Sequence, residues 1–459
     1  MNLNEYIASL KDKRIAVAGI GISNTPLIRL LAENGIGVTA CDRRSPEALG
    51  DVYGELAALG VQFKLGDGYL DGLEADVVFR TPGLHPETPG LLEAVRNGAV
   101  LTSEMEAFFE VCPCRIAAVT GSDGKTTTTT VIAELLKTAG YTVHTGGNIG
   151  RPLLCEAGSM KPEDVAVLEL SSFQLMTMRR SAEIAVVTNV GPNHLDIHKN
   201  LEEYVDAKRN VFRYQGPDGL VVLNLDNELT RSFIPEAKGR VRTFSRRERP
   251  EDGVYLEDGV IWDARGGCRE RIMDASEIFI PGVHNIENYM AAFAAVRDLV
   301  PREVCRRVAA EFTGVEHRIE LVRTLRGVKY YNDSIASSPS RTIAGLRCFD
   351  KKVILIAGGK DKGVSFDELG PEIVEHVKTL VLTGYTAEKI RDAVLKAPGY
   401  AGQPEILMVE DFRDAVITAQ RAAEEGDTVI LSPASTSFDR FKNFEERGNV
   451  FKKIVNELE

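Results

Sequence analysis

A short segment around residue 121 has the residue types of a phosphate-binding loop. Gly121, Gly124, Lys125 and Thr126 follow an apolar run at 116–119 and precede a stretch at 126–137 that is typical of a helix. Such a loop directs backbone N–H groups and the positive end of the helix at a phosphate. The lysine reaches the terminal phosphates of a nucleotide, and the threonine hydroxyl ligates Mg²⁺. The alternative is an ordinary glycine-rich turn. We assign the predicted nucleotide loop to Gly121, Ser122, Asp123, Gly124, Lys125, Thr126 and Thr127.

Two further polar residues follow strands of the same series. Glu169 lies in the predicted strand at 165–170, and His194 follows the next predicted strand at 184–190. Carboxyl ends of parallel strands meet at one edge of a sheet, so both residues are expected near Lys125. A carboxylate in that position is a natural Mg²⁺ ligand. A lone histidine is usually structural, so for His194 packing stands beside a contact to the metal or substrate.

The amino-terminal region has the pattern of a dinucleotide-binding domain. Gly19 and Gly21 follow a predicted strand at 14–19 and open a helix, and Asp42 ends the second predicted strand, at 37–41. Glycines let the backbone approach a diphosphate, and an acid at that strand end suits a ribose hydroxyl. The third glycine of the usual motif is replaced by Asn24, so this signal is weak. By itself it would suggest a nicotinamide-dependent dehydrogenase, or only a structural turn.

Size and composition exclude several classes of protein. A chain of 459 residues is too long for one core and predicts two to four domains. The net charge of −12 argues against a nucleic-acid binder, which needs a basic surface. No apolar run approaches the ~20 residues that span a bilayer, and no secretory signal is evident, so we expect a cytoplasmic protein. The seven cysteines are scattered, and the close pair Cys112 and Cys114 lacks a second pair for a zinc site.

Strand-like runs alternate with helical stretches along most of the chain, which predicts an α/β fold with parallel sheets. The first series includes a strand at 75–79, and the second begins at residue 116. Glu257, Asp258 and Gly259 form a predicted hairpin turn near 254–262. A third series runs through 328, 353–357, 379–382 and 428–431. Joints near Ser103 and Gly314 divide the chain into predicted domains 1–103, 104–314 and 315–459.

The nucleotide loop departs from the general phosphate-loop spacing in an informative way. That spacing requires glycine at Val119, whereas here the additional glycine is Gly121. In this form the loop resembles the ATP loop of the Mur ligases, which form amide bonds at the expense of ATP, and of the related folylpolyglutamate synthase. Other blocks resemble Mur ligase motifs over nearly the whole chain, namely Gly146–Gly150, Glu169–Gln174, His284–Asn288, His317–Arg318, Asn332–Pro339, Gly358–Lys362 and Ser432–Gly448.

The resemblance implies a fold and a set of ligands. It implies a Rossmann-like first domain that holds a UDP-sugar, a central P-loop ATPase-like domain and a Rossmann-like carboxyl-terminal domain that holds an amino acid. It implies ATP and two Mg²⁺ ions, one of them bound through Lys208 after carbamylation by CO₂. The implied metal ligands are Thr126, Glu169, His194 and Lys208. The implied catalytic residues are Lys125, Lys208, His194 and Glu169.

The resemblance also implies contacts to the other substrates. Further ATP contacts fall on Asn285, Asn288, Arg318 and Asp333. Contacts to the UDP-sugar peptide and the amino acid fall on Ile22, Ser23, Asp42, Arg43, Arg44, Thr81, Pro82, Gly83, Asn148, Gln174, Ser337, Lys362, Ser437, Phe438 and Phe444. One departure concerns Ile335, where some family members have a lysine. We expect Arg341 or Lys360 to take its place.

The combination of the blocks at 171–175 and 437–448 resembles the Mur ligases that add D-glutamate to UDP-N-acetylmuramoyl-L-alanine. The implied reaction passes through an acyl phosphate in peptidoglycan precursor synthesis, with a monomeric enzyme. A dehydrogenase leaves Lys125, Glu169 and the carboxyl-terminal blocks unexplained. A non-catalytic nucleotide-binding regulator would not need Glu169, His194 and Lys208 together. Folylpolyglutamate synthase is the nearest enzyme alternative, but it lacks the UDP-binding first domain.

Overall fold

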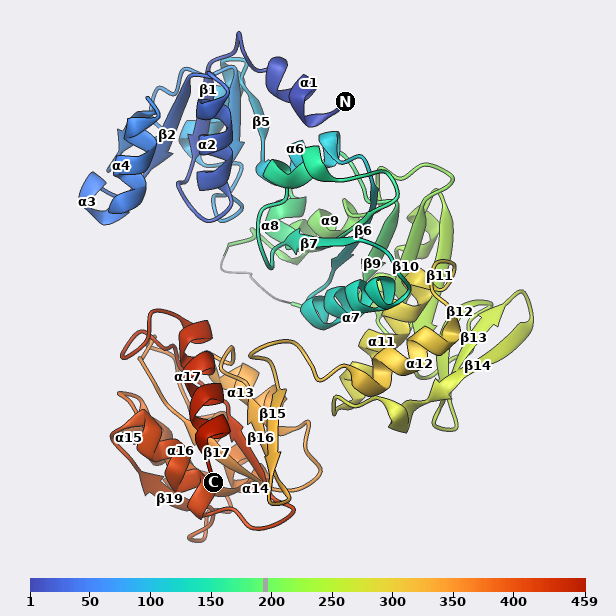
Figure 1. The fold of residues 1–459 in the computed structure, drawn as a ribbon, viewed down its shortest axis with the longest axis vertical. Coiled ribbons are helices and arrows are strands. Elements are labelled where there is room, and N and C mark those ends of the chain that lie inside the picture. The colour runs from blue at the N-terminus through green and yellow to red at the C-terminus, as the bar shows by residue number, and fades with distance from the viewer. Residues whose placement is uncertain (193–196) are drawn as a thin grey trace. The chain divides into compact units, whose positions relative to one another are not determined.

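The computed structural model describes residues 1–192 and 197–459 and contains three β-sheets (Figure 1). The described chain divides into two compact units, one of residues 1–277 and 286–310 and the other of residues 278–285 and 311–459. The α/β class is confirmed. The predicted boundaries at residues 103 and 314 stay predictions. Among the described residues, no helix has both the length and the apolar character needed to cross a membrane.

The first sheet is parallel throughout and has the strand order β3-β2-β1-β4-β5. Its strands are β1 (Ile15–Ala18), β2 (Val38–Asp42), β3 (Gln62–Leu65), β4 (Val77–Arg80) and β5 (Val100–Thr102). Its helices are α1 (Leu3–Ala8), α2 (Asn24–Glu33), α3 (Pro46–Leu49), α4 (Asp51–Ala58) and α5 (Pro89–Arg96). Val17 of β1 pairs with Ala40 of β2 on one side and with Phe79 of β4 on the other. All three side chains are buried, as expected for the central strands of a parallel sheet.

The second sheet has nine strands in the order β14-β13-β12-β11-β10-β9-β6-β8-β7. These are β6 (Arg115–Thr120), β7 (Val143–Gly147), β8 (Val165–Glu169), β9 (Ile184–Val187), β10 (Leu220–Asn224), β11 (Arg240–Ser245), β12 (Asp252–Glu257), β13 (Val260–Arg265) and β14 (Cys268–Asp274). Only the β12–β13 and β13–β14 pairs are antiparallel, and the first of them is the predicted hairpin. The helices of this region are α6 (Glu104–Val111), α7 (Lys125–Thr138), η1 (Leu154–Ser159), α8 (Ser172–Leu175), α9 (Leu201–Arg209), α10 (Glu228–Arg231), η2 (Ile234–Glu236), η3 (Ala275–Glu277), α11 (Val283–Val296) and α12 (Arg302–Glu311).

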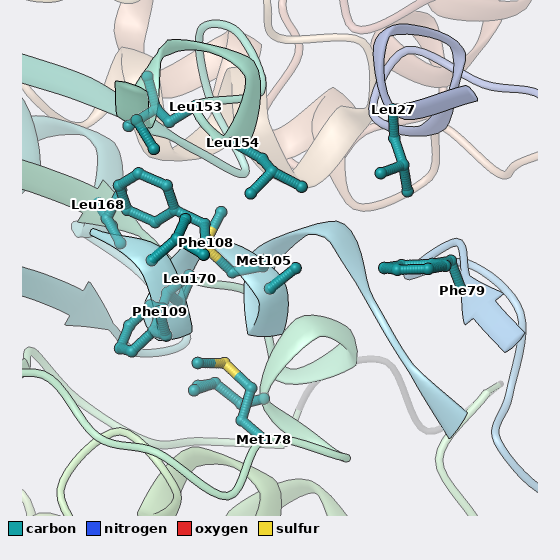
Figure 2. Close-up of a cluster of buried hydrophobic side chains, with 14 of the residues drawn as sticks. Leu27, Phe79, Met105, Phe108, Phe109, Leu153, Leu154, Leu168, Leu170 and Met178 are labelled. Atoms are coloured by element: carbon teal, nitrogen blue, oxygen red, sulfur yellow. The ribbon is translucent and has the colours of Figure 1, made fainter. Parts of the chain in front are cut away.

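One hydrophobic core extends from the first sheet into the second. Figure 2 shows Phe79 and Leu27 from the first sheet and its helix α2, Phe108 from α6, and Leu154 and Leu168 from the second region. All five side chains are buried in the same cluster. The burial of this apolar surface explains why residues 1–277 form one compact unit.

The third sheet has six strands in the order β15-β16-β20-β17-β18-β19, of which only β15 and β16 pair antiparallel. The strands are β15 (Glu320–Leu325), β16 (Val328–Asn332), β17 (Val353–Ala357), β18 (Val377–Leu382), β19 (Glu405–Met408) and β20 (Thr428–Leu431). The helices are α13 (Pro339–Leu346), α14 (Leu369–His376), α15 (Ala387–Leu395), α16 (Phe412–Arg421) and α17 (Phe444–Glu457). Separate apolar clusters cover the two faces of the sheet, as expected for a mainly parallel sheet.

Candidate functional site

The predicted nucleotide loop joins β6 to α7, which is the geometry of a phosphate-binding loop (Figure 1). Gly121 has φ +150°, and a Cβ there would lie 1.9 Å from Thr188 Oγ1. Gly124 has φ +76° and precedes α7, and a Cβ there would lie 2.2 Å from Asn288 Oδ1. Both positions therefore require glycine, because any side chain would be strained and would collide with a neighbouring element.

Hydrogen bonds hold the loop against the ends of neighbouring strands. The Ser122 N–H donates to Asn189 O at 2.8 Å, and the Asp123 N–H donates to Asn189 Oδ1 at 2.9 Å. Ser122 Oγ lies 2.9 Å from the hydroxyl of Tyr204. Lys125 Nζ donates to Ser122 O at 2.8 Å, so the lysine head lies over the loop. These contacts fix the path of the loop, with the Ser122 and Asp123 N–H groups used by Asn189.

Glu169 ends β8, which is the neighbour of β6, as the sequence predicts. Its Oε1 accepts a hydrogen bond from Asn148 Nδ2 at 2.8 Å, and its backbone oxygen accepts one from the Asn148 N–H at 2.7 Å. Its Oε2 is buried and has no hydrogen-bond partner among the residues that the structure describes. A buried carboxylate oxygen left without a partner is costly unless a ligand completes it. The position therefore fits a divalent cation, whose preferred ligands are oxygens.

Lys208 lies on α9 and is only 1% exposed, although a helical lysine is normally solvated. Its Nζ donates to Gly121 O at 2.7 Å and lies 4.5 Å from the ring centre of Tyr204. Burial lowers the pKa of the Lys208 ammonium well below its ordinary value, and the nearby charge of Lys125 lowers it further. The charges of Asp123 and Glu169 oppose this shift. The sequence gives no signal for this burial.

The two predicted substrate loops of the first sheet lie against each other. Gly19 has φ +94°, and a Cβ there would lie 2.6 Å from Thr81 Cγ2. Asp42 accepts hydrogen bonds from the Ile20 N–H at 2.7 Å and from Arg44 Nε at 2.9 Å. Burial raises the pKa of the Asp42 carboxyl, but the bonds from Arg44 and Ile20 outweigh it and hold the pKa below its ordinary value. The carboxylate thus bonds to its own loop through Arg44 and to the loop after β1 through the Ile20 N–H.

The remaining predicted residues of the first sheet surround these loops. Ile22 is 84% exposed and Arg43 is exposed, whereas Ser23, Thr81 and Pro82 are half-buried. Gly83 is exposed in the same loop as Pro82. In the second region, Gln174 is buried, and its Oε1 accepts the Ser171 N–H at 3.0 Å. His194 lies outside the described residues, so its predicted contact stays a prediction.

The residues predicted to contact ATP lie on α11 and in the second unit, and most of them form hydrogen bonds within the protein. Asn288 Oδ1 accepts a hydrogen bond from Thr128 Oγ1 at 3.3 Å, which places it beside the nucleotide loop. Asn285 donates to Pro281 O. In the second unit, Asp333 is buried and accepts a hydrogen bond from Ser432 Oγ at 2.7 Å. Burial raises the pKa of the Asp333 carboxyl to about 7. Arg318 is half-buried.

The predicted amino-acid residues lie on loops at the carboxyl ends of strands in the third sheet, except Phe444, which begins α17. Lys362 is exposed in the loop after β17, and Phe438 is 61% exposed in the loop after β20. Ser437 is buried, and Phe444 and Ser337 are half-buried. Arg341 Nη1 donates to Ile335 O at 3.3 Å, and Lys360 is exposed.

Sequence reasoning missed two buried arginines beside these loops. Arg447 donates to Ser334 Oγ at 3.0 Å and to Ser435 O at 3.1 Å, so it joins two of the predicted loops of the third sheet. Arg80, at the end of β4, donates to the backbone oxygen of Leu84 in the predicted substrate loop and to that of Phe173 on α8. One feature of the sequence could have indicated the role of Arg80: it is an arginine at the end of an otherwise apolar strand, directly before Thr81.

Comparison with known proteins agrees with this arrangement. Residues 119–296 match the family described as Mur ligase middle domain, and residues 317–435 match the Mur ligase, glutamate ligase domain. The chain belongs to the Mur ligase family. A relative from Acetivibrio thermocellus is 54% identical, with 100% of this chain and 99% of the relative covered. It is named UDP-N-acetylmuramoylalanine--D-glutamate ligase, as is a 52% identical relative from Ruminiclostridium cellulolyticum, with 99% of each chain covered.

Solved structures share the fold. A UDP-N-acetylmuramate-alanine ligase from Thermotoga maritima is 18% identical, with a TM-score of 0.60 and 97% and 99% of the two chains covered. A MurF ligase from the same organism, solved in complex with ADP, is 18% identical with a TM-score of 0.56, and 98% of this chain and 97% of that chain are covered. The three-domain α/β architecture expected from the sequence is therefore confirmed as the fold of this family.

Proposed function

We propose that this protein joins D-glutamate to UDP-N-acetylmuramoyl-L-alanine, with ATP converted to ADP and phosphate, in cytoplasmic peptidoglycan precursor synthesis. The observation that carries the proposal is the position of Lys208, whose buried Nζ bonds to the nucleotide loop beside Glu169. Relatives about 50% identical over the full length carry the name of this activity. We further propose that the enzyme acts as a monomer.

The chemistry follows from what must be stabilised. A carboxylate is a poor acylating agent, and phosphoryl transfer from ATP converts the L-alanyl carboxylate to an acyl phosphate. Phosphoryl transfer depends mainly on positioning and on stabilising the charge of the transferring group. Lys125 and the backbone N–H groups at the start of α7 supply fixed positive charge at that place. The amine of D-glutamate then displaces the phosphate and forms the amide bond.

Glu169, Thr126, His194 and Lys208 are the proposed ligands of two Mg²⁺ ions. The ions would neutralise negative charge on the transferring phosphoryl group. The support from the structure is the unpartnered buried Oε2 of Glu169. A protonated lysine cannot ligate a metal, so we propose that the neutral amine of Lys208, which the lowered pKa favours, reacts with CO₂. The product is a carbamate with the release of one proton, and a carbamate is an anionic oxygen ligand.

We propose that the loops at the carboxyl ends of the first and third sheets hold the other two substrates. The facing loops at Gly19 and Thr81 would bind the UDP-sugar, since a glycine after the first strand lets the backbone approach a diphosphate. Lys362, Ser437 and Phe438 would bind D-glutamate, since their two loops pair at Lys360 and Thr436, and an ammonium and a hydroxyl suit its two carboxylates.

The decisive experiment measures phosphate release with UDP-N-acetylmuramoyl-L-alanine, ATP, Mg²⁺ and a panel of D- and L-amino acids. Release should require the UDP-sugar peptide and should be fastest with D-glutamate. Phosphate release that does not depend on the UDP-sugar peptide would indicate an ATPase instead. A preference for L-glutamate added to a folate would indicate a different ligase.

A further inference from the structure

The end of β4 carries a buried arginine that no step of the proposed reaction uses. Arg80 is 0% exposed, and its guanidinium donates hydrogen bonds in two directions. Nη1 donates to Leu84 O at 2.8 Å, to Pro82 O at 3.1 Å and to Thr81 O at 3.4 Å. These three carbonyls belong to the loop that follows β4. A single guanidinium thus fixes the path of this loop.

The other side of the guanidinium reaches the segment that follows Glu169. Arg80 Nη2 donates to Phe173 O at 2.8 Å and to Thr177 Oγ1 at 3.3 Å. Phe173 lies on α8, which begins three residues after Glu169. The planar fork of an arginine can serve two sets of acceptors at once, which a lysine ammonium cannot do with the same geometry. Arg80 therefore joins the loop after β4 to the segment that carries the predicted metal ligand.

A chain of polar contacts extends this link to the predicted domain joint. Thr177 Oγ1 donates to Glu106 Oε2 at 3.0 Å, and Ser103 Oγ donates to the same oxygen at 2.9 Å. Burial lowers the pKa of the Arg80 guanidinium to about 10, while the charge of Glu106 raises it, so the group stays cationic near neutral pH. We call Arg80, Thr177, Glu106 and Ser103 the Arg80 network. A buried network of this kind is expensive to disrupt, because each lost partner leaves another polar group unsatisfied.

The loop that Arg80 holds also forms one wall of the predicted UDP-sugar site. The Thr81 N–H donates to Ala18 O at 2.9 Å, and Thr81 Cγ2 closely faces Gly19. Movement of Thr81 would therefore disturb both predicted substrate loops together. We propose that Arg80 is a positioning residue that holds the loop of residues 81–84 against the segment after Glu169 and thereby sets the affinity for the UDP-sugar substrate. This inference rests on the proposed function.

The test compares Arg80→Met with Arg96→Met, which removes an exposed arginine of the same sheet region. The readouts are the KM values for UDP-N-acetylmuramoyl-L-alanine and for ATP, and the Kd of the UDP-sugar peptide measured calorimetrically without ATP. Arg80→Met should raise the KM and Kd for the UDP-sugar peptide about tenfold, because several buried acceptors lose their donor. The KM for ATP should change less than about twofold. Arg96→Met should change none of them.

Two milder variants keep the proposal testable if Arg80→Met does not fold. Arg80→Lys retains the charge without the fork, and Thr177→Val removes only the hydroxyl contact. At least one of them should weaken binding of the UDP-sugar peptide about threefold or more. Unchanged binding in both, or equal losses for ATP and the UDP-sugar peptide in Arg80→Met, would overturn the inference. A wild-type protein that neither binds nor turns over the UDP-sugar peptide would instead refute the proposed function, and the role of Arg80 with it.

Discussion

Asn148 and Glu169 meet at the ends of two neighbouring parallel strands. Gly147 of β7 lies opposite Glu169 of β8, so the next residue, Asn148, reaches the carboxylate with its side-chain amide and the strand end with its N–H. The amide engages Oε1 at 2.8 Å and leaves Oε2 as the buried oxygen without a described partner. The resemblance implies a contact of Asn148 to the UDP-sugar peptide or the amino acid. This geometry adds a hydrogen bond that orients the carboxylate of Glu169, the proposed metal ligand.

Asn148→Ala should therefore raise the Mg²⁺ concentration needed for half-maximal activity. Groups that orient a metal ligand typically contribute on the order of tenfold or more to metal affinity. The measurement is the rate of phosphate release against free Mg²⁺, with the exposed Asn97→Ala as the control. A variant with an unchanged Mg²⁺ dependence and a raised KM for the UDP-sugar peptide would return Asn148 to a direct substrate contact.

Lys125→Ala should abolish ligation and leave the fold intact. Removal of one preorganised charge from the phosphate site should raise the barrier by about 3 kcal/mol or more, on the order of a hundredfold in rate. Lys137→Ala removes an exposed lysine at the other end of the same helix and serves as the matched control. Near-normal turnover by a well-folded Lys125→Ala protein would contradict the assignment of the nucleotide loop.

Lys208→Ala should also lose activity, and short carboxylic acids in the assay should restore part of it by supplying an anionic oxygen ligand. The cavity left by the buried side chain gives such an acid room to bind. Lys208→Arg is the comparison, because it keeps a cation and has no amine that can form the carbamate. A high-resolution electron-density map of active enzyme equilibrated with CO₂ should show the modified lysine. An unmodified lysine in that map would refute the carbamate.

Lys362→Ala should raise the KM for D-glutamate much more than the KM for ATP. The ammonium is exposed in this structure and is free of the desolvation that would make an uncompensated charge costly before substrate binds. D-glutamate should also be used far better than D-glutamine, since a neutral side chain cannot form an ion pair with the ammonium in the bound complex. Lys396→Ala, an exposed lysine of the same unit, is the control. A defect confined to ATP would move Lys362 to the phosphate contacts.

Glu104 predicts a pH dependence of stability. Its carboxylate is buried at the start of α6 and accepts the Leu154 N–H at 2.9 Å. Burial raises the pKa of this carboxyl to about 7, and the backbone hydrogen bonds from Leu154 and Leu153 oppose the shift. The folded state therefore holds the proton more tightly than the unfolded state. This contribution to stability is complete below the unfolded pKa and is lost as the pH rises through about 7.

The corresponding experiment compares thermal unfolding of the wild-type protein and Glu104→Gln between pH 5 and pH 8. The neutral amide keeps an acceptor for the Leu154 N–H at every pH. The wild-type protein should lose up to about 3 kcal/mol relative to the variant as the pH rises across this range. The exposed Glu93→Gln should show no such trend relative to wild type. A constant difference between wild type and Glu104→Gln would mean that Glu104 does not change its protonation on unfolding.

Local patterns in the sequence were sufficient to predict where most of the strands lie. The predicted strands at 353–357 and 428–431 have the observed bounds, because apolar runs between turn residues are characteristic of buried parallel strands. The strand predicted at 184–190 ends instead at Val187. Beyond Val187 the chain bonds with the nucleotide loop. Thr188 Oγ1 donates to Asp123 O at 2.6 Å, and Asn189 O accepts the Ser122 N–H at 2.8 Å. Contacts with the nucleotide loop thus end the strand earlier than its apolar pattern predicts.

The sequence by itself determined the α/β class, the nucleotide loop between β6 and α7, and the edge of the sheet where Glu169 lies. These features depend on local periodicity, on glycine at required backbone angles, and on the rule that parallel strand ends share an edge. Only the tertiary structure decided that Lys208 is buried and that Arg80 joins two segments. Their partners, Gly121 and Phe173, lie 87 and 93 residues away in the chain, so packing between distant elements sets the environment of each charge.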